Sequence, residues 1–395
     1  MVGKYTLRLL RYKYFLVLAA ASILTTVAVW LPFLLRLDSF WGISLPKDGM
    51  ATIVANYDGL FYIVAAKSWY DPAAITGQYP FQLEPIYYSA HYPLYPLLIR
   101  GVATVFPFLG YPYAMIITTL VSGILAVIMF YLLLLELGLK KQALWLALLF
   151  TFFPARWLVV RSIGSPEPLF IFTILASIYF FLKEKWWYAA FFGALAQLTK
   201  PPGILLFIGY IIALIAPYWQ KLAHTDAQDW LRKLPWKAWP LLLIPLTLLS
   251  IYAFYGLRYG DFFAYFNSGD NIHLTFPPFQ AFNPGQAWVG TFWLEEIVWL
   301  YLFGALGVLY LIKQKNVVLA SFASVFFITL MFVSHRDISR YSLPLVPLLY
   351  IAFSKVLDFK EFKWVVLVLL IPIYLFSIVF IANNVTPVGD WKPLL

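Results

Sequence analysis

Long apolar runs separated by short charged or proline-containing segments recur from residue 14 to residue 382, and this pattern constrains the fold most. A helix needs roughly 20 apolar residues to cross a hydrocarbon core about 30 Å thick. Hydrophobic residues make up 63% and charged residues 12% of the chain, and this charged fraction is about half that of a soluble globular protein. The sequence therefore predicts an all-α integral membrane protein with many spanning helices.

Hydropathy divides the chain into about eleven predicted transmembrane helices. With the N-terminus in the cytoplasm, every basic cluster between spans falls on the inner side, as the positive-inside rule requires. These clusters lie at 140–141, 183–185, 221–237, 313–315 and 355–363. The predicted spans are residues 14–37, 113–137, 143–161, 168–183, 186–199, 203–219, 238–256, 296–312, 316–334, 341–357 and 364–382.

The segment 91–109 is apolar enough to be a span, but counting it would reverse every later loop and place Lys140 and Lys313 outside. Its three prolines suit a segment that lies against protein better than a straight helix facing lipid. We interpret it as a juxtamembrane or re-entrant helix, and a twelve-helix arrangement is the alternative. Two long outer segments then remain, 38–112 and 257–295, and we expect the chemistry there.

We expect two modules. Residues 1–220 form a catalytic transmembrane module that includes outer loop 38–112, and residues 221–395 form a C-terminal transmembrane module with outer loop 257–295. The net charge of +10 is spread over short clusters between spans, which argues against a nucleic-acid partner. The chain has no cysteine, so disulfides and thiolate metal sites are excluded. It also lacks a P-loop, a GxSxG elbow and HExxH spacing, so a nucleotide-driven pump and a serine hydrolase have no support.

Asp58 begins an amphipathic stretch of the first outer segment. A carboxylate beside the membrane surface can accept the proton of a sugar hydroxyl as that oxygen attacks, which is the task of a general base. The alternative is that Asp58 caps a helix whose apolar face rests on the bilayer. Composition alone leaves both interpretations open.

The turn between the third and fourth predicted spans places Arg161 and Glu167 on the same outer face. Glu167 could bind a hydroxyl or, together with Asp58, a divalent cation such as Mg²⁺ or Mn²⁺. Hard cations need several oxygen ligands, and these two acids are the visible candidates. The alternative is that Glu167 caps the fourth helix while Arg161 anchors the third in lipid headgroups.

Four further cations, Lys200, Arg258, Arg336 and Arg340, end spans on the predicted outer side, against the positive-inside tendency. An anionic lipid phosphate is a natural partner, because arginine makes bidentate, charge-assisted bonds to phosphate oxygens. Snorkelling to ordinary headgroups, or an ion pair between an arginine and Asp337, explains any single one equally well.

Several short motifs follow one another along the chain: YDGLFY (57–62), HYPLYPLLIR (91–100), GSPEPLF (164–170), ALAQLTKPPG (194–203) and RYSLPLVP (340–347). Together they resemble the GT-C class of polytopic glycosyltransferases, and within it the PIG-V-like mannosyltransferases that extend GPI anchors and their prokaryotic relatives. Order and spacing agree over residues 50–205. The family usually has arginine at the position of Lys200, so the charge is kept without the bidentate fork.

The resemblance implies an inverting transferase whose donor is a polyprenyl- or dolichyl-phosphate sugar, most often mannose. Asp58 is then the catalytic base and Glu167 a second active-site acid. The acceptor is a hydroxyl of a glycan, a glycolipid or a protein. The residues expected to bind the donor phosphate are Lys200, Arg336, Arg340 and Arg161, and those expected to line the substrate cleft are Tyr57, Tyr62, His91, Tyr92 and Tyr341.

We expect a multi-pass membrane protein, in the plasma membrane if the source is a prokaryote, with the active site on the outer face. Two other functions stay open at this point. A flippase or transporter for lipid-linked sugars predicts charges near mid-membrane, whereas nearly all charges here lie at span ends. A non-catalytic accessory subunit of a glycosylation complex would need only the fold.

Overall fold

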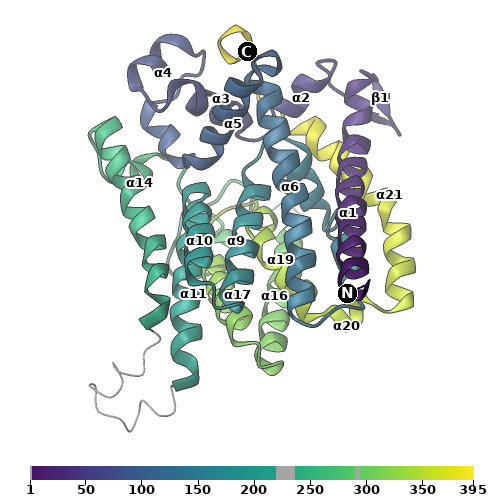
Figure 1. Ribbon diagram of the computed structural model, residues 1–395. Coiled ribbons are helices and arrows are strands. Elements are labelled where there is room, and N and C mark those ends of the chain that lie inside the picture. The colour runs from purple at the N-terminus through teal and green to yellow at the C-terminus, as the bar shows by residue number, and fades with distance from the viewer. Residues whose placement is uncertain (1, 219–235, 290–293) are drawn as a thin grey trace. The chain divides into compact units, whose positions relative to one another are not determined.

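The computed structural model describes residues 2–218, 236–289 and 294–395, and these residues are mostly helical (Figure 1). They divide into two compact units. The first unit comprises Met1–Phe172, Ile251–Asn271 and Lys355–Leu395, and the second comprises Thr173–Ser250 and Ile272–Ser354. The expected module boundary at 220, like most of the predicted inner cluster 221–237, lies outside the described residues, so the two-module division stays a prediction.

In the first unit, α1 packs against α6 and α8, and α8 also packs against α21. A short antiparallel hairpin, with Ser39 opposite Ser44, is an addition to the expected all-α fold. The elements of this unit are α1 (Val2–Leu34), β1 (Ser39–Phe40), β2 (Ile43–Ser44), α2 (Met50–Val54), α3 (Gly59–Ser68), α4 (Pro72–Gln78), η1 (Pro85–Ala90), α5 (Leu94–Val105), η2 (Pro107–Leu109), α6 (Gly110–Glu136), α7 (Ala143–Leu149), α8 (Ala155–Ser162), α15 (Ala264–Asn267), α21 (Lys360–Asn383) and η8 (Lys392–Leu394).

In the second unit, small residues allow close packing of helices. Gly209 brings α11 against α17, where a Cβ on this glycine would lie 3.0 Å from the Cα of Phe322. The elements of this unit are α10 (Trp186–Thr199), η3 (Pro201–Gly203), α11 (Ile204–Ile215), η4 (Ala216–Tyr218), η5 (Trp236–Leu242), η6 (Gln280–Phe282), α16 (Leu294–Lys313), α17 (Val317–Met331), α18 (Ile338–Tyr341), η7 (Leu343–Leu345) and α19 (Val346–Ala352). Three helices contain residues of both units: α9 (Glu167–Leu182), α14 (Leu243–Tyr259) and α20 (Ser354–Leu357).

Among the described residues, five helices are long and apolar enough to cross a membrane, or six if the bent pair α8 and α9 forms one span. The five are Lys13–Leu34, Pro107–Glu136, Trp236–Tyr259, Leu294–Lys313 and Lys360–Asn383. The chain is therefore a multi-pass membrane protein. Several other predicted spans coincide with shorter apolar helices, so the count of about eleven crossings stays a prediction.

The predicted span 143–161 is not one helix. It consists of α7, with seven residues, and α8, with eight, and Pro154 directly precedes α8. Proline has no amide hydrogen to donate and restricts the residue before it, so it fits a helix start and not a helix interior. Hydropathy alone cannot separate one continuous apolar helix from two short ones.

The segment 91–109 contains α5, a helix of 12 residues. At 1.5 Å per residue it is about 18 Å long, which is too short to cross a hydrocarbon core. It packs against α3 and α6 within the first unit. Its length fits the expected juxtamembrane or re-entrant helix and does not fit the additional span of the twelve-helix arrangement.

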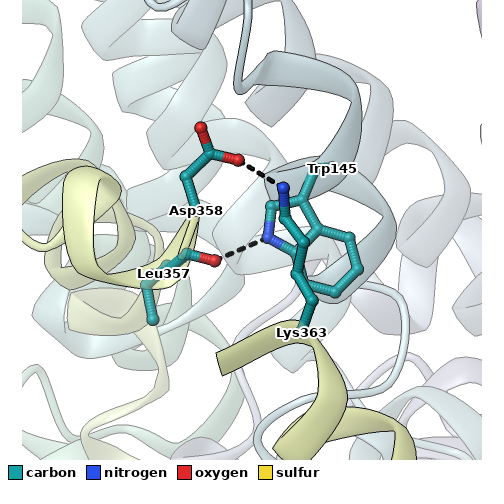
Figure 2. A network of polar contacts seen from close by, with 4 residues as sticks. All are labelled: Trp145, Leu357, Asp358 and Lys363. Atoms are coloured by element: carbon teal, nitrogen blue, oxygen red, sulfur yellow. Dashed lines mark hydrogen bonds and ion pairs between the residues drawn. The ribbon is translucent and has the colours of Figure 1, made fainter. Parts of the chain in front are cut away.

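Figure 1 shows α3, α4, α5 and β1 near the end of α1 that lies away from the N-terminus. Elsewhere in this unit, two loops that the sequence assigns to the inner side lie together (Figure 2). The Trp145 indole donates to the Leu357 carbonyl at 2.7 Å, and Lys363 pairs with Asp358 at 2.6 Å while its ammonium lies 5.5 Å from the Trp145 ring centre. Loops 140–141 and 355–363 are thus connected, as loops on one side of a membrane can be.

Candidate active site

Asp58 occupies the N-cap position of α3, but its side chain makes no capping hydrogen bond. The side chain is half-buried. The alternative interpretation of Asp58 as a helix cap is therefore wrong, and its carboxylate is directed to other partners.

The loop in front of Asp58 is fastened to the C-terminal end of α21. The amide of the buried Asn56 donates to the Ile381 carbonyl at 2.8 Å, and the Thr386 amide donates to the Ala55 carbonyl at 2.8 Å. Tyr57 has a φ of 48°, a left-handed conformation that is uncommon for a tyrosine. Contacts on both sides of Tyr57 thus hold a backbone conformation that the sequence alone does not favour.

Arg156 supports the same loop from α8. Its guanidinium donates to the Tyr57 hydroxyl at 2.9 Å and lies 4.0 Å from the ring centre of Phe380. The Tyr57 ring itself lies 5.4 Å from that of Phe380. This cation–π contact joins α8, α21 and the Asp58 loop. The sequence analysis did not identify Arg156.

Asp58 is one of three potential ligands that converge in the first unit. Carboxylate oxygens of Asp58 and Asp270 and an imidazole nitrogen of His91 all lie within 4.8 Å of one another. His91 follows η1, Asp270 follows α15, and these two short helices pack together. His91 is 2% exposed, whereas Asp270 is exposed.

Aromatic residues hold the His91 ring in place. Its centre lies 4.8 Å from the Tyr62 ring, 5.6 Å from the Tyr87 ring and 5.7 Å from the Phe61 ring. The Tyr70 hydroxyl donates to the His91 carbonyl at 2.5 Å. Two predicted cleft residues, Tyr62 and His91, are therefore in contact. A third, Tyr92, is fully buried with its ring 5.5 Å from that of Tyr265, where it forms part of the supporting core.

Tyr87 completes the polar edge of the cluster. Burial raises the pKa of its hydroxyl, as do the carboxylates of Asp270 and Asp58, and the hydroxyl is hydrogen-bonded to Asp270. It therefore stays protonated and is a donor at neutral pH. Neither Tyr87 nor Asp270 was predicted, because Asp270 lies far from Asp58 in the sequence and belongs to no recognised motif.

Glu167 is the first residue of α9 and is 3% exposed. It accepts a hydrogen bond from the Ser165 hydroxyl. Ser165 in turn exchanges hydrogen bonds of 3.3 Å with Thr119. Its carboxylate is not part of the ligand cluster in the described chain, so the ligand set expected from the sequence, Asp58 with Glu167, is replaced by Asp58, His91 and Asp270.

The turn before Glu167 nevertheless lies beside the start of α3. A Cβ on Gly59 would lie 2.6 Å from the Val54 carbonyl oxygen and 3.3 Å from that of Gly164. Residue 59 must therefore be glycine for the Asp58 loop and the Glu167 turn to approach this closely.

Arg161 does not have the position expected of a phosphate ligand. It is 1% exposed, and its guanidinium donates to the Thr25 hydroxyl at 2.8 Å and to the Ser22 carbonyl at 3.4 Å, both on α1. This burial also excludes the headgroup anchor considered above. We therefore remove Arg161 from the donor site and assign it the structural role of joining α8 to α1.

The other predicted cations lie in the second unit. The Lys200 ammonium lies 5.9 Å from the ring centre of Tyr341, and the His335 ring lies 5.0 Å from the same ring. Arg336 is exposed and Arg340 is half-buried. Lys200, Tyr341 and the 335–340 segment thus form one group, hereafter the cation group.

Comparison with solved structures shows the fold. ArnT from Cupriavidus metallidurans bound to undecaprenyl phosphate matches with a TM-score of 0.55 and 13% identity over 89% of this chain. The Archaeoglobus fulgidus oligosaccharyltransferase tethered with an acceptor peptide matches with 0.54 and 14% over 96%. AglB from that organism, in complex with an inhibitory peptide and a dolichol-phosphate, matches with 0.52 and 15% over 96%. These proteins are GT-C glycosyltransferases. The chain has the GT-C fold.

This chain spans 62% of the length of ArnT and 56% and 57% of the two oligosaccharyltransferase chains. The sequence matches no protein-family model and no curated protein. The likeness therefore establishes the architecture of the membrane enzyme, while donor, acceptor and activity follow from the residues of this chain.

We predict that Gly59→Ala destabilises the protein by about 1–3 kcal/mol, because the new methyl group collides with the backbone carbonyl of Val54. Gly164→Ala is the matched control. Its Cβ would meet the flexible end of the Met115 side chain, which can move aside. Thermal unfolding of the purified protein in detergent measures both, and equal losses for the two variants would contradict this explanation.

We predict that Arg161→Met lowers the free energy of unfolding by about 2 kcal/mol, because buried acceptors on α1 lose a charged donor. Thr25→Val should cause a smaller loss in the same direction. Both are measured by thermal unfolding. Unchanged stability of Arg161→Met would show that the guanidinium does not join α8 to α1.

Proposed function

We propose that the chain is an inverting glycosyltransferase that moves a sugar from a polyprenyl- or dolichyl-phosphate carrier to an acceptor hydroxyl on the outer face of the membrane. One observation carries the proposal: a half-buried Asp58, converging with His91 and Asp270, at the start of α3 in a chain with the GT-C fold. The donor class is supported by the neighbours, since ArnT is bound to undecaprenyl phosphate and AglB to a dolichol-phosphate.

In the proposed reaction, Asp58 accepts the proton of the acceptor hydroxyl. The acceptor oxygen forms a bond to the anomeric carbon while the bond from that carbon to the phosphate oxygen breaks, and the electron pair leaves with the phosphate. A single displacement of this kind inverts the anomeric configuration. The Tyr87 hydroxyl, kept protonated beside Asp270, can donate to a sugar hydroxyl at this edge.

The leaving phosphate gains negative charge, which preorganised cations stabilise. We assign this task to Lys200, Arg336 and Arg340 of the cation group, with Tyr341 between Lys200 and His335. Glu167 is proposed as the second acid. Because Ser165 and Thr119 fix its turn beside Gly59, its proposed contribution is to position the loop that carries Asp58.

The sequence motifs support mannose as the sugar and a GPI-anchor-type or related glycan, glycolipid or protein as the acceptor. We also propose that the N-terminus is cytoplasmic, which puts the Asp58 end of the first unit on the outer face. The basic loops 140–141 and 355–363 would then be inside, in agreement with the positive-inside rule.

The ligand cluster fits a divalent cation, because two carboxylates and one imidazole supply three ligand atoms from three separate segments. Of the two cations expected from the sequence, Mn²⁺ suits a mixed nitrogen and oxygen set better than Mg²⁺, which prefers oxygen ligands. We propose Asp58, His91 and Asp270 as its ligands. A bound cation would add positive charge beside the reacting sugar. It would also restrict the orientation of Asp58.

We predict that Asp58→Asn lowers sugar transfer at least about a hundredfold, because the amide cannot accept the proton. The assay supplies radiolabelled polyprenyl-phosphate mannose and a mixed acceptor extract to purified protein in liposomes. Asp71→Asn is the matched control. Asp71 caps α4 by accepting from Ala73 and Ala74, and asparagine keeps this cap.

Loss of transfer in a folded Asp58→Asn variant, with normal transfer by Asp71→Asn, is the expected result. Equal transfer by wild type and Asp58→Asn would remove Asp58 from the mechanism. Wild-type protein that moves the labelled lipid between leaflets without transferring sugar would instead indicate a flippase.

We predict that chelation lowers transfer and that Mn²⁺ restores it. Asp270→Asn should weaken Mn²⁺ binding, followed by electron paramagnetic resonance, at least about tenfold. Asp261→Asn is the control, since Asp261 only orders the start of α15 by accepting from the Phe263 amide at 2.8 Å. Wild-type Mn²⁺ affinity in Asp270→Asn would disprove the ligand assignment.

A further inference from the structure

His335 lies in the cation group but was assigned no role by the sequence motifs. Its Nδ1 accepts a hydrogen bond from the Asp337 amide at 2.9 Å. A backbone amide can only donate, so Nδ1 must be the unprotonated nitrogen of the neutral ring. The proton of neutral His335 is therefore on Nε2, and this N–H is a hydrogen-bond donor directed away from Asp337.

The backbone of His335 is fixed from both sides. The preceding Ser334 amide donates to the His273 carbonyl at 2.9 Å, and Leu274 forms a β-bridge with Val333. The ring itself lies between two aromatic residues, 6.2 Å from Trp288 and 5.0 Å from Tyr341. His335 is thus held in one orientation, as a binding residue needs to be.

The charged surroundings of His335 are mostly positive. Burial lowers its pKa. The carboxylate of Asp337 opposes this effect, while Arg340, Arg336 and His273 add to it. Lys200 lies on the far side of the neighbouring Tyr341 ring. In the absence of an anion, His335 is therefore mainly neutral at pH 7.

We propose that His335 is a further ligand of the donor phosphate: its Nε2–H binds a phosphate oxygen, and the ring takes up a proton when the anion binds. This inference rests on the proposed function, because it adds a residue and a pH dependence to the same phosphate site. The ligand is a lipid phosphodiester, which carries one negative charge.

The direction of the effect follows from linkage. A bound anion favours the protonated imidazole, so His335 has a higher pKa in the complex than in the free protein. Donor affinity then rises as the pH falls from the pKa of the complex to that of the free protein. Each unit of difference between the two pKa values gives about tenfold in affinity.

The experiment measures binding of a polyprenyl phosphomannose to the full chain in nanodiscs between about pH 5.5 and about pH 8, around the ordinary histidine pKa. A phosphodiester keeps its charge over this range, so any pH dependence comes from the protein. His335→Gln keeps an N–H donor but cannot titrate. His273→Gln is the control, since His273 is exposed and lies in the same part of the second unit.

We expect wild type and His273→Gln to bind the donor more tightly at low pH, and His335→Gln to bind with a constant affinity near that of wild type at high pH. A constant affinity of wild type, or a wild-type pH dependence in His335→Gln, would overturn the inference while leaving the proposed function in place. Absence of donor binding by wild type at every pH would overturn both.

Discussion

The fastening of the Asp58 loop to the C-terminal end of α21 is the interaction on which the candidate site most depends. Asn56 and Thr386 link the two segments, and Arg156 secures Tyr57 from α8. Tyr57 keeps its left-handed backbone only because these contacts outweigh the local preference. A general base must be held within a fraction of an ångström of its working position, and here residues far apart in the sequence provide that rigidity.

The sequence predicted most helices, because a long apolar run has few alternatives in a membrane. It placed α1, α6, α16 and α21 near their observed positions. It was wrong for 143–161, where Pro154 separates two short helices within one apolar run. The β1–β2 hairpin was also missed, since strands of two residues leave no periodic signal.

For the site, motif recognition identified Asp58, His91 and Tyr62, which the structure brings together within the first unit. It could not identify Asp270 or Tyr87, because their proximity depends on how α15 packs against η1. Arg161 was misassigned for a related reason: a cation at the end of an apolar run looks the same whether it faces lipid phosphate or the hydroxyl of Thr25 on a neighbouring helix. Pairwise packing, which one sequence does not contain, decides between the two.

The most direct test of the central claim is the anomeric configuration of the product. Purified protein would be given a polyprenyl-phosphate mannose of known anomeric configuration and an acceptor glycolipid, and the new linkage would be identified by nuclear magnetic resonance. Base catalysis by Asp58 in a single displacement predicts the opposite configuration in the product. Retention of the donor configuration would contradict a single displacement, and no new linkage at all would contradict the proposed transferase.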